Sequence, residues 1–108
     1  MVSEIRTVTV SVSASSSAIV SVSFEKDLNV IGIQATERAG TSLSNVHFTI
    51  DIDGQYLIRP SMPVSQLGSM YYQSMPLKFS VKKGSTLKFS VTNNLTSAVT
   101  IDFALLIE

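Results

Sequence analysis

Apolar and polar residues alternate along most of this chain, which is the pattern of strands with one face buried and the other in water. The alternation is clear in TVTVSVS (7–13) and VHFTIDI (46–52), and no segment shows the longer period of an amphipathic helix. The pattern predicts about eight strands. They are residues 7–13, 18–24, 28–35, 46–52, 55–59, 77–81, 87–91 and 98–108.

Two short polar stretches predict tight turns between strands. Asp53-Gly54 is a strong hairpin signal because both residue types tolerate positive φ. The tetrapeptide KFSV occurs twice, on either side of Gly84, with its apolar residues in matching positions. We therefore predict one hairpin turning at Gly84, in which Phe79 lies opposite Phe89.

Eight short antiparallel strands in 108 residues predict an all-β, two-sheet sandwich with jelly-roll or another Greek-key topology. The length suits one domain over residues 1–108. An immunoglobulin-type sandwich is the second possibility, although its Cys and Trp spacing is absent, and a closed barrel is the third. The last strand carries Val99, Ile101 and Phe103 on one face, and we expect it to be buried.

Composition narrows the function classes. The formal net charge is zero, which gives no overall field to gather nucleic acid or an anionic membrane. Cysteine is absent, which excludes disulfides, thiolate chemistry and cysteine metal sites. Glu4 and Arg6 interrupt the start of the chain, so we expect no signal peptide. No stretch approaches the ~18 apolar residues that span a bilayer, so we expect a soluble protein without membrane insertion.

The few residues with catalytic potential are better explained by structure. His47 is the only histidine, and no turn of the kind that presents a serine nucleophile accompanies it. Asp51 and Asp53 have the spacing of a carboxylate pair and of the opening of a calcium loop, but the later calcium ligands are missing. We predict no catalytic, cofactor-binding or metal-binding residue and no enzymatic activity.

Two surface features suit solubility or modification. Lys78, Lys82, Lys83 and Lys88 gather around the KFSV repeat, but the neighbouring aromatic residues fall on the opposite face, where they cannot stack on bases. We therefore interpret these lysines as protection of a strand edge rather than as a nucleic-acid site. Asn94-Leu95-Thr96 is a sequon that permits glycosylation.

The segment PSMPVSQLGSMYYQSMP (60–76) is expected to be irregular and is rich in methionine and tyrosine, which suit contact surfaces. We predict that it contacts a partner or folds back to close one end of the sandwich. The candidate contact residues are Met62, Val64, Leu67, Met70, Tyr71, Tyr72 and Met75. The stretch between Arg6 and Glu25 is uncharged and repetitive, so it could also pair with the edge of another subunit.

The strand pattern, the turn VKKGSTL (81–87) and the segment VTNNLTSAVTIDF (91–103) together resemble small jelly-roll coat, decoration, turret or penton-type proteins of bacteriophages and archaeal viruses. This resemblance implies a virus capsid or capsid-associated subunit located in the virion. It would act through contacts with itself as a homo-oligomer or with other capsid proteins. The resemblance implies no cofactor and supplies no catalytic residues.

Two hypotheses from other classes stay open. One is a small carbohydrate- or ligand-binding module that uses Tyr56, Tyr71 and Tyr72 with Asp51 or Gln55. The other is a small hydrolase built around His47 and Asp51.

Overall fold

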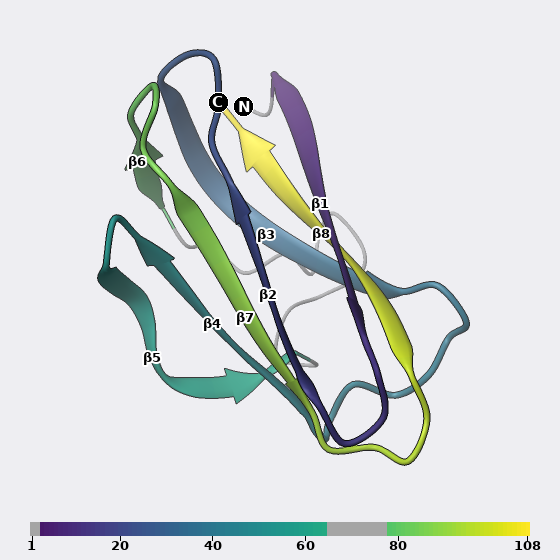
Figure 1. The fold of residues 1–108 in the computed structure, drawn as a ribbon. Coiled ribbons are helices and arrows are strands. Elements are labelled where there is room, and N and C mark those ends of the chain that lie inside the picture. The colour runs from purple at the N-terminus through teal and green to yellow at the C-terminus, as the bar shows by residue number, and fades with distance from the viewer. Residues whose placement is uncertain (1–2, 65–77) are drawn as a thin grey trace.

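The structure is a computed structural model that describes residues 3–64 and 78–108, and only the backbone at 58–62. The described residues form eight strands and no α-helix (Figure 1). The strands are β1 (Glu4–Val12), β2 (Ser17–Val22), β3 (Leu28–Glu37), β4 (Val46–Ile52), β5 (Gln55–Pro63), β6 (Phe79–Val81), β7 (Leu87–Asn93) and β8 (Val99–Ile107).

The strands form two four-stranded antiparallel sheets that pack face to face. Sheet A has the order β1-β8-β3-β6 and sheet B the order β2-β7-β4-β5. The first strand therefore pairs with the eighth, the second with the seventh, the third with the sixth and the fourth with the fifth. A long hairpin of strands 1–4 against strands 5–8, rolled into two layers, gives this order. It confirms the predicted sandwich and identifies its topology as a jelly roll.

The predicted KFSV hairpin is wrong. Strand β6 pairs with β3 in sheet A, and β7 lies between β2 and β4 in sheet B, so the two copies are in different sheets. Gly84 does have the positive φ expected of a turn, at 83°, but the turn crosses between the layers. The prediction failed because alternation fixes which face of a strand is apolar and leaves its hydrogen-bonding neighbour open.

The crossing turn is held by other loops at the same end of the sandwich. The amide of Lys83 donates to the carboxylate of Asp27 at 2.7 Å, and the amide of Thr86 donates to that of Asp53 at 2.9 Å. Asp53 and Gly54 have φ values of 50° and 88°, which confirms the predicted turn between β4 and β5. Local turn chemistry was therefore predictable at both positions, whereas the strands that a turn connects were predicted correctly for Asp53-Gly54 and wrongly for Gly84.

Strand β5 extends through Pro63, so residues 60–63, which were predicted to be irregular, belong to a strand. Pro60 and Pro63 are tolerated because β5 is the outer strand of sheet B, where a missing N–H breaks no internal ladder. The remainder of the predicted segment, residues 65–76, lies outside the described residues.

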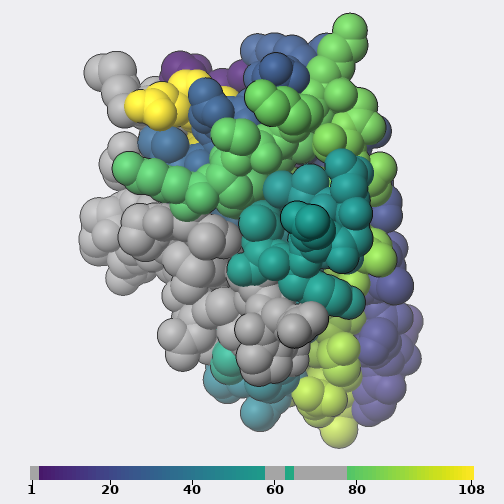
Figure 2. Space-filling view, turned by 90° about the vertical axis from the view of Figure 1, so that its left-hand side faces the viewer, coloured from purple at the N-terminus to yellow at the C-terminus, as the bar shows by residue number. Residues whose placement is uncertain are grey.

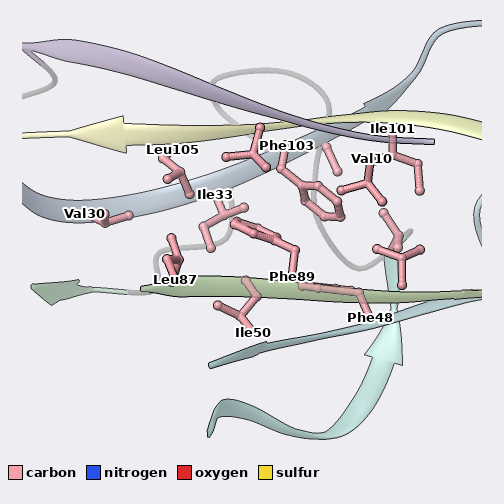
Figure 3. Packing of buried hydrophobic residues seen from close by; sticks show 14 of the residues in the cluster. Val10, Val30, Ile33, Phe48, Ile50, Leu87, Phe89, Ile101, Phe103 and Leu105 are labelled. Carbon is pink, nitrogen blue, oxygen red and sulfur yellow. The ribbon is translucent and has the colours of Figure 1, made fainter. Parts of the chain in front are cut away.

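Three phenylalanines join the sheets at the centre of the core. Phe103 of sheet A lies 5.0 Å from Phe89 and 5.5 Å from Phe48 between ring centroids, and both partners belong to sheet B (Figure 3). All three side chains are fully buried. Tilted aromatic pairs at these distances stabilise a core beyond the area that they bury. The predicted burial of the last strand is confirmed, since its inward residues from Val99 to Ile107 are all in the core.

A buried asparagine closes one end of the sandwich. The Asn93 side-chain amide donates to the carbonyls of Ser13 and Ser97 at 3.2 and 2.9 Å, with a longer contact of 3.5 Å to that of Val12. Its side-chain oxygen accepts from the amide of Leu95 at 2.9 Å. One side chain thus joins the β1–β2 and β7–β8 connections and leaves no polar atom of its own unpaired.

We expect Phe103→Ala to lower the free energy of unfolding by about 3–5 kcal/mol, because it opens a cavity between the two sheets. Ile5→Ala is the matched control. Ile5 is 58% exposed, and its loss should change stability by less than about 0.5 kcal/mol. Equal urea midpoints for the two point variants would contradict this account of the core.

Deletion of residues 103–108 removes half of a central strand and should abolish soluble expression.

Candidate interaction surfaces

The outer face of sheet B carries a largely uncharged array of side chains across β2, β7 and β4. Its rows follow from the strand register and cross from β2 through β7 to β4. The first row is Ser17, Thr92 and His47, the second is Ile19, Ser90 and Thr49, and the third is Ser21, Lys88 and Asp51. Hydroxyl groups dominate the first two rows, and the only charges are at the end where β4 turns into β5.

The array does not assemble the hydrolase suggested by His47 and Asp51. They lie four residues apart on β4, which separates them by about 13 Å at the usual rise of a strand. Asp51 is instead an ion-pair partner, with its carboxylate 3.4 Å from the Lys88 ammonium, and it is only 5% exposed. His47 lies opposite Thr92 at the other end of the array. The geometry gives this pair no shared reacting position.

Hydrogen bonds and ion pairs lower the pKa of four carboxyl groups, those of Glu4, Glu25, Glu37 and Asp102. Backbone amides, that of Thr100 most strongly, lower the pKa of Glu37, which accepts hydrogen bonds of 2.8–3.0 Å from three of them. The Arg38 guanidinium, with help from the Thr9 hydroxyl, lowers the pKa of Asp102. A general acid needs a raised pKa. Every carboxyl pKa shift resolved within residues 3–64 and 78–108 is downward.

Glu4, Arg6, Glu25 and Lys26 form an ionic cluster at the end of the sandwich opposite Asn93. Arg6 contacts both Glu4 and Glu25 at 2.5 Å, and Lys26 lies 3.2 Å from Glu4. Arg6 is the main cause of the lowered pKa of both carboxyl groups. Arg6 and Glu4 have the parity of the buried valines on β1, so these two side chains lie on the inward face of the strand, whereas Glu25 and Lys26 are exposed.

The four lysines around the KFSV repeat do not share one surface. Lys88 lies on the outer face of sheet B beside Asp51. Lys82 and Lys83 belong to the crossing turn next to Asp27, at 4.0 Å for the Lys82 ammonium, and Lys78 precedes β6. Carboxylates therefore accompany part of this positive charge, and no continuous basic stripe joins the four residues.

An open groove lies on the side of the molecule where sheet B meets β6. It has a volume of about 450 Å³. Figure 2 views this side, with the β4–β5 region beside the segment that contains β6. The groove is lined by Ile52, Asp53, Gln55, Tyr56, Leu57 and Ser80. The structure thus brings together Tyr56 and Gln55 of the ligand-binding hypothesis, with Asp51 opposite Tyr56 in the strand register.

The predicted contact residues are only partly accounted for. Val64 is fully buried and packs in the hydrophobic core, so it has a packing role in this chain rather than an exposed contact. Met62 lies in β5, where only the backbone is described. The rest of the set, Leu67, Met70, Tyr71, Tyr72 and Met75, lies outside the described residues.

The described surface exposes large apolar side chains at Ile5, Ile19 and Tyr56, which are 58%, 64% and 52% exposed. Ile5 and Ile19 lie on β1 and β2, two of the four strands at the edges of the sheets (Figure 1). The sequence contained a signal for them that the prediction of partner contacts missed. Each isoleucine occupies a position whose neighbours two residues away are polar or charged along the strand, so alternation places it outside.

Comparison with known proteins finds no family model and no curated protein that matches this chain. Within the described ranges, no group of three or more His, Cys, Asp or Glu side chains could hold a metal ion. None of the described segments forms a helix long and apolar enough to cross a membrane.

We expect Glu37→Gln to lower the free energy of unfolding at pH 7 by about 1–3 kcal/mol, because an amide NH₂ would face backbone N–H donors. The folded pKa of Glu37 lies below its unfolded value near 4.5. Charged Glu37 therefore stabilises the fold above that pH, and the contribution is lost as the pH falls through the folded pKa. Urea unfolding of the variant should accordingly vary less between pH 5 and pH 3 than that of the wild type.

Glu25→Gln is the control, because that carboxylate is 65% exposed and its ion pair is screened by water. Equal losses in the two variants, or an unchanged pH dependence in Glu37→Gln, would contradict the structural role of Glu37.

Proposed function

We propose that this chain is a non-enzymatic structural subunit of a virus particle, either in the capsid wall or attached to it, and that it acts through contacts between subunits. The observation that carries the proposal is the strand order, in which each of the first four strands pairs with its counterpart among the last four. The same topology is implied by the resemblance to small phage and archaeal-virus jelly-roll proteins.

The chemistry of the surfaces supports a contact role. One fold serves many functions, so the strand order needs support from the surfaces themselves. The outer face of sheet B bears mostly hydroxyl groups. Among the carboxylates, Asp51 forms an ion pair, Asp53 accepts a hydrogen bond from a turn amide, and Glu37 accepts one from a backbone amide of β8. The rows of sheet B across β2, β7 and β4 carry few charges, which suits burial against another protein surface better than capture of a charged substrate.

The test is whether the chain is part of a particle. Particles from the source of the sequence would be separated on a density gradient and probed with an antibody to the recombinant chain. We expect the chain to co-sediment with the main coat protein at a fixed ratio, and to remain after a salt wash. A chain found only in the soluble fractions would contradict the proposal.

The groove supports a second candidate function, a carbohydrate- or ligand-binding module. Tyr56 offers an exposed ring, and Gln55 and Asp53 supply polar groups beside it. An aromatic face flanked by such groups is a common arrangement for binding the apolar face of a sugar.

A set of soluble oligosaccharides, followed by tyrosine fluorescence or NMR, tests this candidate. If a sugar binds, Tyr56→Ala should abolish binding, whereas Tyr56→Phe should retain most of it because the ring is kept. Binding that survives Tyr56→Ala, or the absence of any binding sugar, would count against the groove.

A further inference from the structure

We propose that strand β2 pairs with β2 of a second copy of this chain across a two-fold axis at Ile19, so that two B sheets become one continuous sheet. The inference rests on the proposed function only in naming the partner as another subunit of the same kind. It is carried by the register of sheet B, by the exposure of Ile19 and by the absence, within β2 itself, of the features that protect the other outer strands.

The register determines which backbone groups of β2 face the free edge. The amide of Asn93 donates to the carbonyl of Ser16 at 2.8 Å, and this pair continues the β2–β7 ladder. Hydrogen-bonded and non-hydrogen-bonded pairs alternate along an antiparallel ladder, so Ala18 and Val20 bond to β7. The backbone N–H and C=O groups of Ser17, Ile19 and Ser21 therefore point away from β7, toward the free edge.

The other side of β7 supports the same phase. The amide of Asn94 donates to the carbonyl of Asn45 at 3.2 Å, and that of Asp53 donates to Thr86 at 3.0 Å. Both pairs lie on the β4–β7 register. Their members on the β7 side, Thr86 and Asn94, are even-numbered, so the even-numbered residues of β7 bond to β4. The odd-numbered residues of β7 are thus left to bond β2, as the pair of Asn93 with Ser16 requires.

These outward groups are self-complementary. An antiparallel copy centred on Ile19 places Ile19 opposite Ile19 of the partner subunit and Ser17 opposite the partner's Ser21. All three resulting pairs are of the hydrogen-bonded type, which gives about six backbone hydrogen bonds. Two exposed isoleucines then meet on the outer face, where each alone is 64% exposed. On the inner face, the half-buried Ala18 and Val20 gain a neighbouring strand.

The other three outer strands carry features that block such pairing, and β2 carries none of them. Strand β1 has the inward-pointing charges Glu4 and Arg6. Strand β5 contains two prolines and two register shifts, and β6 is three residues long. Inward charges, proline, bulges and short length are the usual protections of a sheet edge. Strand β2, SAIVSV, is uncharged, regular and free of proline, which makes it the edge best suited to a second copy.

Light scattering of the purified full-length chain should give twice the 11.7 kDa chain mass at tens of micromolar. Ile19→Arg should give the single-chain mass, because two guanidinium groups would meet at the axis. Ile5→Arg is the matched control, since Ile5 is an isoleucine of similar exposure on β1, and it should stay dimeric. A wild-type monomer at that concentration, or equal masses for the two variants, would overturn the proposal.

Cross-linking tests the register directly, because the chain has no native cysteine. In the proposed pair, the Cβ atoms at position 19 of the two subunits lie about 5 Å apart. Ile19→Cys should therefore be joined by a short thiol cross-linker. Ser17→Cys alone should not cross-link, because its two copies lie about 13 Å apart. A mixture of Ser17→Cys and Ser21→Cys should give the heterodimer.

Equal cross-linking of Ile19→Cys and Ile5→Cys, or efficient self-linking of Ser17→Cys, would overturn the register. Circular dichroism of each variant shows that the chain is folded. The particle experiment and this one fail separately. Co-sedimentation with a particle does not need β2 pairing, and cross-linking in solution does not need a particle.

Discussion

The contact of Phe103 with Phe48 and Phe89 is the interaction on which the rest of the structure depends. Phe103 belongs to a central strand of sheet A, and its two partners belong to the two central strands of sheet B. The rings meet only if β4 and β7 lie side by side and face β8, which is the arrangement that the rolled topology creates. Burial of this centre also sets the side of each neighbouring strand that must be apolar.

Polar groups are used mainly to close the ends of this core. At one end Asn93 pairs with carbonyls of two connections, and at the other end Arg6 joins two glutamates and lies over the Phe24 ring, 5.9 Å from its centroid. Glu37 serves the loop after β3 and the start of β8. These groups stabilise connections that a small sandwich could not close with apolar residues alone.

The outer strands link the fold to the proposed assembly. A jelly roll remains open at the edges of both sheets, so each outer strand must be protected or paired. Charges, prolines and short length protect three of these strands, and β2 has none of these features. A structural subunit benefits from one unprotected edge, because backbone hydrogen bonds between copies fix both the orientation and the register of the contact.

The sequence by itself determined the strands, their buried faces and the Asp53-Gly54 turn, because period-two alternation and positive φ are properties of a few neighbouring residues. It also placed Ile19 on the exposed face of β2. Apart from the β4–β5 hairpin, only the tertiary structure decided strand partners. The two KFSV copies have equal faces, and their separation into different sheets depends on competition among all eight strands. Likewise, Asn93 and Glu37 bond to groups 81 and 63 residues away, so no local pattern could assign their roles.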